Sequence, residues 1–228
     1  MMEGKAKSTR VFGSFASKNI ELFSEHTLER IKKLTFKKLV IHLKNFFYKR
    51  ATLLVVYKEF DKRPSIQMPR LEANCKFLNT SYTEQINSLS NLARDRIAEF
   101  FAAGAKCLGF FYEGKLVGYT WCHYHDYEFP FFAFSLEIDK GVYIGPSFVA
   151  NEFRGKRIHG FLLTKMFSFL YDQGYKYVWS SVLSDNYSSL KGLISVGFRA
   201  RKKIKVVRVF KAIVYKNIAI FTQKQGNY

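Results

Sequence analysis

The most restrictive feature of this sequence lies between residues 142 and 171, where three patterns follow one another directly. Residues 142–149 are apolar and favour a strand. From 158 to 171 the apolar side chains recur every three or four residues, which predicts a helix, and Gly174 stands where that helix should end. Residues 154–157, RGKR, connect the two. A strand that enters a helix through such a loop predicts an α/β fold.

The connecting loop has the chemistry of an anion site. The N–H groups in the first turn of a helix lack intrahelical partners, and the aligned peptide dipoles make that end partly positive. Gly155 and Gly160 permit a close approach of the backbone, while Arg154, Lys156 and Arg157 add formal charge. An exposed basic loop before an ordinary helix is equally consistent with this loop alone.

The rest of the chain continues the alternation of strand and helix patterns. Glycines at 104, 174 and 197 follow helical patterns and are expected to end them. We predict strands at 51–57, 75–78, 142–149, 175–183, within 204–210 and within 212–221, a hairpin with a three-residue turn at Glu113-Gly114-Lys115, and helices at 83–93, 94–103, 158–171 and 186–196.

The N-terminal region differs from the rest. Residues 28–49 combine apolar positions at helical spacing with many lysines, which predicts a basic amphipathic helix. Such a helix either lies on an anionic membrane or docks on its own domain. Residues 58–70 are charged and contain a proline, which indicates a linker. We therefore expect an N-terminal helix, strand and linker at 1–70 and a main domain at 71–228.

The charge balance limits the partners without choosing among them. The chain has 37 basic and 18 acidic residues, a net charge of +19, which attracts phosphates, acidic polysaccharides, anionic lipids or nucleic acid. An apolar content of 48% argues for a globular protein. Cys75, Cys107 and Cys122 form no metal-type spacing, and the chain shows neither a signal peptide nor a membrane-spanning run. We expect a cytoplasmic protein, with any membrane contact peripheral to the inner face.

Residues 149–163 resemble the acyl-CoA-binding signature of the GNAT acyltransferase superfamily, in which a valine ends a strand and a basic glycine loop leads into a helix. A second element agrees with this resemblance. Further along, the family carries an asparagine, a small residue and a Gly-Phe pair, and Asn186, Ser189 and Gly197-Phe198 stand at that spacing. The resemblance covers roughly residues 75–210. It implies a GNAT-like acyl-CoA N-acyltransferase fold, in which helices flank a mixed, mostly antiparallel sheet.

The resemblance also implies the cofactor, acetyl-CoA or another acyl-CoA, and where it would lie. Strands 142–149 and 175–183 would diverge, and the pantetheine arm would lie in the gap and pair with backbone groups of the first strand. The N–H groups of residues 154–160 would hold the pyrophosphate. The implied cofactor-binding residues are Phe148, Val149, Arg154, Gly155, Lys156, Arg157, Ile158, His159, Gly160, Asn186 and Ser189.

The sequence departs from the family pattern at the phosphate loop. The two glycines of the signature fall at Arg157 and His159, and only Gly160, one place further on, offers a partial substitute. The side chains of Arg157 and His159 must therefore point away from a bound cofactor, or binding is weakened.

The catalytic residues of many relatives are also replaced. The strand glutamate that relays a proton in the family corresponds to Tyr143, a poor base at neutral pH, and the helix tyrosine corresponds to Leu193. We single out Tyr143 and His125, because imidazole titrates near neutrality. His123 and His125 would share one face of a strand. Alternatively they are a surface pair, and a metal site with Asp126 would lack further ligands.

The leading functional prediction is an acyl-CoA-dependent acyltransferase that acts on an amine, with a hydroxyl as the second choice. The aromatic faces of segment 124–141 suit stacking on sugar rings or bases, but Phe131, Phe132 and Phe134 are more simply explained as core or interface. The basic segment 199–216 either meets an acidic or phosphorylated part of a substrate or is a solvated face. A sugar or polysaccharide precursor is the acceptor that these features suggest. The alternative is a catalytically inactive, GNAT-like basic binding module for a membrane surface or nucleic acid. Nucleic acid is the less favoured partner.

Overall fold

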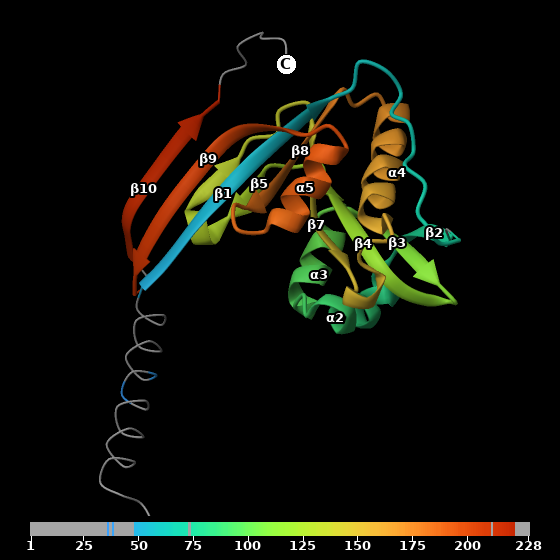
Figure 1. The fold of residues 1–228 in the computed structure, drawn as a ribbon, viewed down its shortest axis with the longest axis horizontal. Coiled ribbons are helices and arrows are strands. Elements are labelled where there is room, and N and C mark those ends of the chain that lie inside the picture. The colour runs from blue at the N-terminus through green and yellow to red at the C-terminus, as the bar shows by residue number, and fades with distance from the viewer. Residues whose placement is uncertain (1–35, 37, 39–47, 73, 211, 222–228) are drawn as a thin grey trace, which may run out of the picture. The chain divides into compact units, whose positions relative to one another are not determined.

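The computed structural model describes residues 36, 38, 48–72, 74–210 and 212–221 (Figure 1). Contacts divide the chain into two units, one with residues 50–208 and the residues from 213 onward, the other with residues up to 49 and 209–212. The sites considered below belong to the first unit. The amphipathic helix predicted at 28–49 lies outside the described residues, except for Phe36 and Lys38, which are helical, and for residues 48 and 49.

Eight strands form one sheet in the order β10-β9-β1-β8-β7-β4-β3-β2, and β5 and β6 form a separate pair (Figure 1). This mostly antiparallel sheet with flanking helices confirms the predicted fold class. The strands are β1 (Tyr48–Glu59), β2 (Asn74–Leu78), β3 (Lys106–Tyr112), β4 (Lys115–His123), β5 (Tyr127–Phe129), β6 (Phe134–Leu136), β7 (Val142–Val149), β8 (Tyr177–Leu183), β9 (Arg199–Val209) and β10 (Ala212–Ile220). The helices are α2 (Thr83–Ser90), α3 (Arg94–Ala102), α4 (Ile158–Asp172) and α5 (Tyr187–Ser195), with short 3-10 helices at Thr80–Tyr82, Pro130–Phe132 and Asn151–Phe153.

Each face of the sheet buries its own apolar layer, because successive side chains of a strand point to opposite faces. Helices α4 and α5 bury Phe161, Phe167 and Leu193 in one cluster with residues of β3, β7 and β8. Helices α2 and α3 form a second cluster with Tyr119 and Trp121 of β4. Ten of the fifteen residues of α4 are buried, which is more than the single apolar face predicted. Besides the sheet and α5, the segment after β1 covers this helix.

That segment, residues 60–72, is called the strap here. It was predicted to be a linker, and this prediction is wrong, because the strap is bonded along the length of α4. The N–H of Gln67 donates to Thr164 Oγ1 at 2.9 Å, and the N–H of Arg70 donates to the carbonyl of Lys156 at 2.9 Å. The strap is therefore hydrogen-bonded both to the loop at residues 154–157 and to helix α4, which follows that loop.

Strand β1 lies inside the sheet, between β8 and β9. It pairs antiparallel with β8 from Leu53, opposite Leu183, to Glu59, opposite Tyr177. The sequence analysis identified this strand but assigned it to an N-terminal arm, because pairing partners over a hundred residues away leave no local signal. Its position matters for function, since Leu53 reaches the cavity described below.

Most predicted element boundaries lie close to the observed ones, and the hairpin turn is the clearest exception. The turn between β3 and β4 has two residues, Glu113 and Gly114, with φ of 48° and 75°. Two successive positive φ angles are typical of the type I′ turn that matches the twist of a hairpin. The predicted three-residue turn is therefore wrong, because Lys115 already begins β4.

The aromatic segment after β4 packs against the sheet. Phe132 is 5% exposed and joins a third cluster with Leu53 and Val55 of β1 and Ile204 and Val206 of β9. The interpretation of this segment as core is confirmed for Phe132.

Candidate functional site

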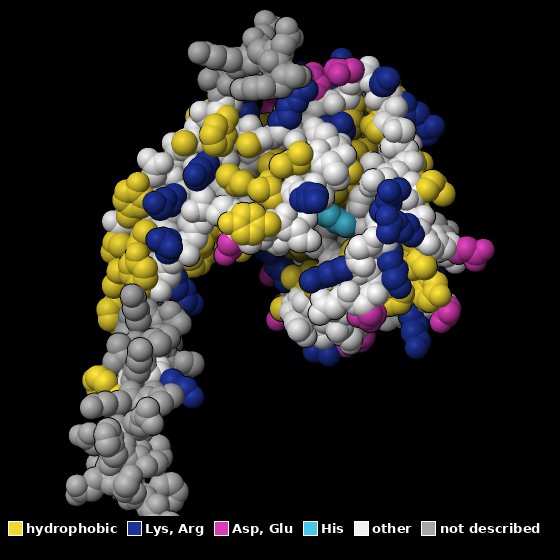
Figure 2. Space-filling model, viewed as in Figure 1, with side chains coloured by type: hydrophobic (Ala, Val, Ile, Leu, Met, Phe, Trp, Pro, Cys, Tyr) yellow, Lys and Arg dark blue, Asp and Glu magenta, His cyan; other side chains and the backbone are white. Residues whose placement is uncertain are grey.

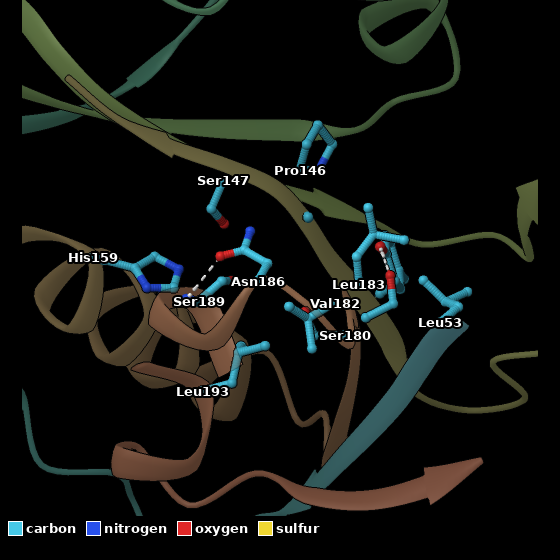
Figure 3. Close-up of a pocket in the computed structure, with 13 residues that line it drawn as sticks. Leu53, Pro146, Ser147, His159, Ser180, Val182, Leu183, Asn186, Ser189 and Leu193 are labelled. Carbon is cyan, nitrogen blue, oxygen red and sulfur yellow. Dashed lines mark hydrogen bonds between the residues drawn. The ribbon is translucent and has the colours of Figure 1, made fainter. Parts of the chain in front are cut away.

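Strands β7 and β8 are parallel neighbours that separate after two residue pairs. They pair only at Val142 with Val178 and at Tyr143 with Trp179, although β7 continues to Val149. Neighbouring strands normally remain about 4.8 Å apart. A cavity of about 260 Å³ lies where they diverge (Figure 3). The structure therefore contains the gap that the resemblance implied.

Two side-chain hydrogen bonds define the closed end of the gap. Ser180 Oγ donates to the carbonyl oxygen of Ile144 at 2.8 Å, and the hydroxyls of Tyr143 and Ser181 lie 2.8 Å apart. A side chain of β8 thus satisfies a β7 carbonyl that a regular ladder would pair with a backbone N–H. Beyond this point the two backbones do not pair, so the β8-facing edge of β7 is open to a ligand.

The lining of the cavity is rich in hydroxyls and contains no carboxylate among the residues that line it. The polar side chains come from β7, β8 and the N-terminal ends of α4 and α5, and apolar side chains fill the remaining wall. The lining residues are Leu53, Tyr143, Gly145, Pro146, Ser147, His159, Ser180, Ser181, Val182, Leu183, Asn186, Ser189 and Leu193. Such a neutral wall suits an uncharged arm with amide and hydroxyl groups better than it suits a cation.

Asn186 joins the cavity to helix α5. Its Oδ1 accepts a hydrogen bond from the N–H of Ser189 at 3.2 Å, which caps the helix (Figure 3). The amide nitrogen of the same side chain faces Ser147 on β7, across the cavity (Figure 3). Asn186 therefore offers a donor toward the cavity while its oxygen remains committed to the helix. The two predicted residues Asn186 and Ser189 both line the cavity.

The N-terminal turn of α4 is open. No side chain caps it, and the N–H groups of Ile158, His159 and Gly160 meet no acceptor within the described part of the chain. Gly155 has φ of 76°, and Arg157, the residue before the helix, has φ of 63°. This left-handed conformation favours glycine, so a non-glycine residue there indicates strain at a functional loop. The turn retains the geometry that a glycine would normally provide.

The replaced glycine at position 159 is accommodated by a glycine on the neighbouring helix. A Cβ built on Gly192 of α5 would lie 2.9 Å from Nδ1 of His159, so the imidazole fills the space that a side chain would need. Burial lowers the pKa of His159 from 6.5 to about 4, and the ring is neutral at pH 7. The side chain points toward α5 and forms part of the cavity wall (Figure 3).

Gly160, in the first turn of α4, lies beside the strap. A Cβ at this position would collide with Oε1 of Gln67, so the strap occupies the space beside this glycine. The role of Gly160 in the approach of a cofactor stays a prediction, and in this structure the side chain of Gln67 lies beside the glycine. The N–H of Gly160 still belongs to the open first turn.

The basic side chains of the loop surround this open turn. Arg154 and Arg157 are exposed, and Lys156 lies over the ring of Phe153 at 4.7 Å. Lysine and arginine side chains are spread over the face that carries α4 and α5 (Figure 2). Arg154 and Arg157 are thus available to an anion at the helix N-terminus.

Phe148 and Val149 lie on the part of β7 that borders the open edge. They pair with Tyr119 and Gly118 of β4 and do not line the cavity with their side chains. Because only the β4 side of this strand is paired, their predicted role through backbone groups is compatible with the geometry and stays a prediction.

Comparison with known proteins identifies the family. A model described as the acetyltransferase (GNAT) family matches residues 71–198, more than half of the chain. The protein belongs to the GNAT family. No curated protein matches the sequence.

Solved structures agree with this family in fold. A putative GNAT acetyltransferase from Novosphingobium aromaticivorans is 15% identical, with a TM-score of 0.53 over 76% of this chain and 66% of that chain. A GCN5-related N-acetyltransferase from Sphaerobacter thermophilus is 15% identical, with a TM-score of 0.52 over 75% of this chain and 55% of that chain. A GNAT-family acetyltransferase from Colwellia psychrerythraea is 17% identical, with a TM-score of 0.52 over 77% of this chain and 61% of that chain. This chain therefore spans less than two thirds of each of these proteins.

Within this GNAT fold, Tyr143 stands at the closed end of the cavity. It is 4% exposed, and its hydroxyl pairs with Ser181. Burial raises the pKa of Tyr143 above its ordinary value of 10, so the phenol remains protonated at neutral pH. Its ring stacks on Tyr127 with centroids 4.0 Å apart. Tyr143 can hold or donate a proton but cannot act as a base near pH 7.

His125 lies elsewhere in the GNAT domain. Strand β4 ends at His123, so the prediction that His123 and His125 share a strand face is wrong. His125 is exposed in the bend that follows and lines a second cavity, of about 220 Å³, rather than the one between β7 and β8. Its role as a base stays a prediction.

Several lining residues escaped the sequence reading. Leu53, Ser147, Ser180 and Ser181 line the cavity, and none was singled out. The adjacent serines in the otherwise apolar strand YVWSSVL were the available signal, because hydroxyls in a buried strand need partners. Leu53 gave no signal, since only the tertiary pairing brings β1 beside β8.

Two features are missing from the described part of the chain, a metal-type cluster of side chains and a helix that could span a membrane. No group of three or more His, Cys, Asp or Glu side chains gathers there in a metal-binding arrangement. No helix within the described residues is long and apolar enough to cross a membrane.

Proposed function

We propose that the protein is an acyl-CoA-dependent acyltransferase that transfers an acyl group, most simply acetyl, from CoA to an amine. One observation carries the proposal. Strands β7 and β8 separate after Tyr143, and the resulting cavity borders the uncapped N-terminal turn of α4. A long ligand with an anionic end and an amide-containing arm fits this combination of an open strand edge and a helix N-terminus.

The residues present fit such a cofactor. The free N–H groups at 158–160, with Arg154 and Arg157, would hold its diphosphate. The open edge of β7 would bind the pantetheine amides, with Ser147 and Asn186 beside them. When bound, acyl-CoA supplies the activated acyl group. The hydroxyls of Tyr143 and Ser181, at the closed end of the cavity, are the groups of this chain that can hold a proton beside the cofactor.

The proton chemistry must proceed without a carboxylate from the cavity wall. The titratable side chains among the lining residues are Tyr143 and His159. A protonated Tyr143, oriented by Ser181, is suited to donate a proton to a leaving thiolate. The attacking amine must lose its proton, and we propose that water accepts it, because neither lining group is an effective base at pH 7.

The test is calorimetric titration with acetyl-CoA on two matched variants. Asn186→Asp keeps an oxygen that caps α5 but replaces the cavity-facing donor by a negative charge. Asn79→Asp makes the same change at the cap of Thr80–Tyr82, outside the cavity. We expect wild type and Asn79→Asp to bind alike and Asn186→Asp to bind at least about tenfold more weakly, the typical effect of losing a hydrogen bond and adding repulsion.

Turnover with amines then decides between the enzyme and the alternative. If acetyl-CoA binds but no amine is acetylated, the inactive GNAT-like binding module is favoured. If wild type shows no binding at millimolar acetyl-CoA, both the cofactor and the activity are wrong. An amino sugar or polysaccharide precursor as acceptor, and peripheral membrane contact through residues 28–49, remain proposals of the sequence analysis.

A further inference from the structure

The strap at residues 60–72 lies along α4, between the end of β1 and the start of β2 (Figure 1). Near the end of the helix, the guanidinium of Arg63 donates to both carboxylate oxygens of Asp172, at 2.9 and 2.6 Å. Further along, the strap is bonded to the helix at Gln67 and to the loop before the helix at Arg70. These contacts fasten one segment to both ends of α4.

The sequence explains why the strap forms neither a helix nor a strand. Pro64 and Pro69 lack an N–H, and each restricts the residue before it to extended backbone. The N–H of Gln67, which lies between them, finds an acceptor in Thr164 Oγ1 at 2.9 Å. The same hydroxyl donates to the carbonyl of Gly160 at 2.8 Å, so the strap is connected to the first turn of the helix.

The contact at Arg70 fixes the orientation of one peptide group in the loop. The N–H of Arg70 donates to the carbonyl oxygen of Lys156 at 2.9 Å. In a trans peptide the C=O group and the next N–H group point in opposite directions, so the N–H of Arg157 points away from the strap. The loop needs such support, because Arg157 has a φ of 63°, a conformation that favours glycine.

The N–H of Arg157 extends a row of free donors. It has no acceptor in the described residues, and neither do the N–H groups of Ile158, His159 and Gly160. Adjacent free N–H groups at the start of a helix together hold an anion. His159 also lines the cavity between β7 and β8, so this row of donors borders the proposed cofactor site.

The opposite orientation of the same peptide group would work against an anion. Turning the peptide over would place the carbonyl oxygen of Lys156 where the N–H of Arg157 now stands, and its partial negative charge would repel a phosphate. The hydrogen bond from Arg70 would be lost in that orientation. The strap therefore favours the orientation in which all four N–H groups can donate to one ligand.

We propose that the strap is a positioning element of the cofactor site. The N–H of Arg70 holds the carbonyl of Lys156 away from the site, and the N–H of Arg157 thereby becomes a donor to the diphosphate of acyl-CoA. The inference rests on the proposed acyltransferase function. Arg70 acts through its backbone and touches no ligand itself, so its side chain can change freely but its N–H cannot be removed.

Arg70→Pro and Arg70→Ala test the N–H alone. Both variants lose the exposed side chain, but only proline lacks the N–H. Calorimetric titration with acetyl-CoA should give an affinity about tenfold lower for Arg70→Pro than for Arg70→Ala, the typical effect of losing a hydrogen-bond donor to a phosphate. Equal affinities of the two variants would overturn the proposal.

S-acetylpantetheine distinguishes positioning from a loss of structure, because it has the acylated arm but no diphosphate. Its affinity, measured by NMR titration, should be the same in Arg70→Pro and Arg70→Ala. A loss for S-acetylpantetheine as large as that for acetyl-CoA would show a purely structural role and refute the proposal.

Met68→Pro is the control for an added proline in the strap. Met68 is exposed, and its N–H has no acceptor among the described residues. This variant should bind acetyl-CoA as wild type does. A loss of affinity equal to that in Arg70→Pro would mean that any proline here disturbs the site, against a specific role for the Arg70 N–H.

Thr164→Val and Thr164→Ser provide the test if Arg70→Pro does not fold. Valine keeps the shape of threonine without the hydroxyl that accepts the Gln67 N–H, whereas serine keeps that hydroxyl. Affinity for acetyl-CoA should fall several-fold in Thr164→Val and be largely restored in Thr164→Ser. Equal affinities in these two variants would contradict a role of the strap in binding.

Amide hydrogen exchange in wild type examines the donor directly. Acetyl-CoA should slow the exchange of the Arg157 N–H, which has no acceptor among the described residues. Unchanged exchange with acetyl-CoA bound would overturn the inference and leave the acyltransferase function standing. If wild type binds no acetyl-CoA at millimolar concentration, the proposed function itself fails.

Discussion

The two cavities of this protein lie on either side of one pair of tyrosine rings and differ in chemistry. The cavity between β7 and β8 is lined by hydroxyls, an amide and apolar groups, without a carboxylate among its lining residues. The cavity at α3 has three carboxylates and one guanidinium among its lining residues. Tyr143 lines the first and stacks on Tyr127 of the second.

The two cavities differ in chemistry because they arise from different features of the fold. The neutral cavity is formed by a defect in a sheet, where a missing ladder leaves backbone groups free, so its recognition is mainly directional hydrogen bonding. The charged cavity is formed by side chains around a bend, and its lining carries formal charges. We therefore expect changes in the two cavities to affect different measurements.

The largest expected effect is on turnover. Tyr143→Phe deletes the hydroxyl that pairs with Ser181 and should lower kcat by about 100-fold or more, the usual size of a general-acid contribution, with little change in acetyl-CoA affinity. Tyr119→Phe is the matched control, since Tyr119 is also buried and its hydroxyl donates to Ser90 Oγ at 2.7 Å, outside both cavities. Steady-state kinetics measure kcat for the two variants, each of which loses one buried tyrosine hydroxyl. Equal loss in both would exclude Tyr143 as the proton donor.

An intermediate effect is expected on stability at acid pH. Burial lowers the pKa of both His123 and His159 from 6.5 to about 4, so the unfolded chain binds these protons first. Stability is therefore complete above about pH 6.5 and is lost as pH falls toward 4, by about 2 kcal/mol per histidine at pH 5. Urea unfolding at pH 7 and pH 5 measures this loss.

In His123→Phe the loss between pH 7 and pH 5 should be smaller by about 2 kcal/mol. Tyr119→Phe should keep the full loss, because the pKa of Tyr119 is raised to about 12, far from this range. A pH dependence that is the same in His123→Phe as in wild type would mean that the histidine is not held neutral by its surroundings.

The smallest expected effect concerns the strained loop before α4. Arg157→Gly relieves the strain of a left-handed conformation, which stabilises the folded state, but it also raises the conformational entropy of the unfolded chain, which destabilises it. Because the two contributions nearly cancel, the free energy of unfolding should change by less than about 1 kcal/mol. Arg154→Gly has no strain to relieve, since Arg154 has φ of −66°, and should be the more destabilising of the two. Thermal unfolding of both variants tests this order.

The fold was largely readable because its elements carry local signals. Residues 142–149 and the helix from Ile158 appear where periodicity placed them, and Gly174 follows the last helical turn as predicted. The strap and the two-residue hairpin turn were missed, because a polar segment and a turn length depend on what they pack against. The candidate site was predicted where it follows the loop motif, at Asn186, Ser189 and the first turn of α4.

The serines of β8 and the acid cavity required tertiary structure. Ser180 and Ser181 matter only because β7 turns away from β8 and leaves its carbonyl of Ile144 to a side chain. Glu99 and Glu128 are twenty-nine positions apart in the sequence and line one cavity only because α3 packs beside the bend after β4. The sequence shows a histidine at position 123, but it does not show that Nε2 of this residue is buried without a hydrogen-bond partner among the described residues.

By itself, the sequence determined the alternation of strands and helices, the family, and the loop that exposes helix N–H groups, because each depends on residues close together in the chain. Only the tertiary structure decided that β1 enters the sheet beside β8, that the strap occupies the space next to Gly160, and that two unlike cavities meet at a pair of stacked tyrosines. Those features arise from contacts between distant segments, which local patterns do not encode.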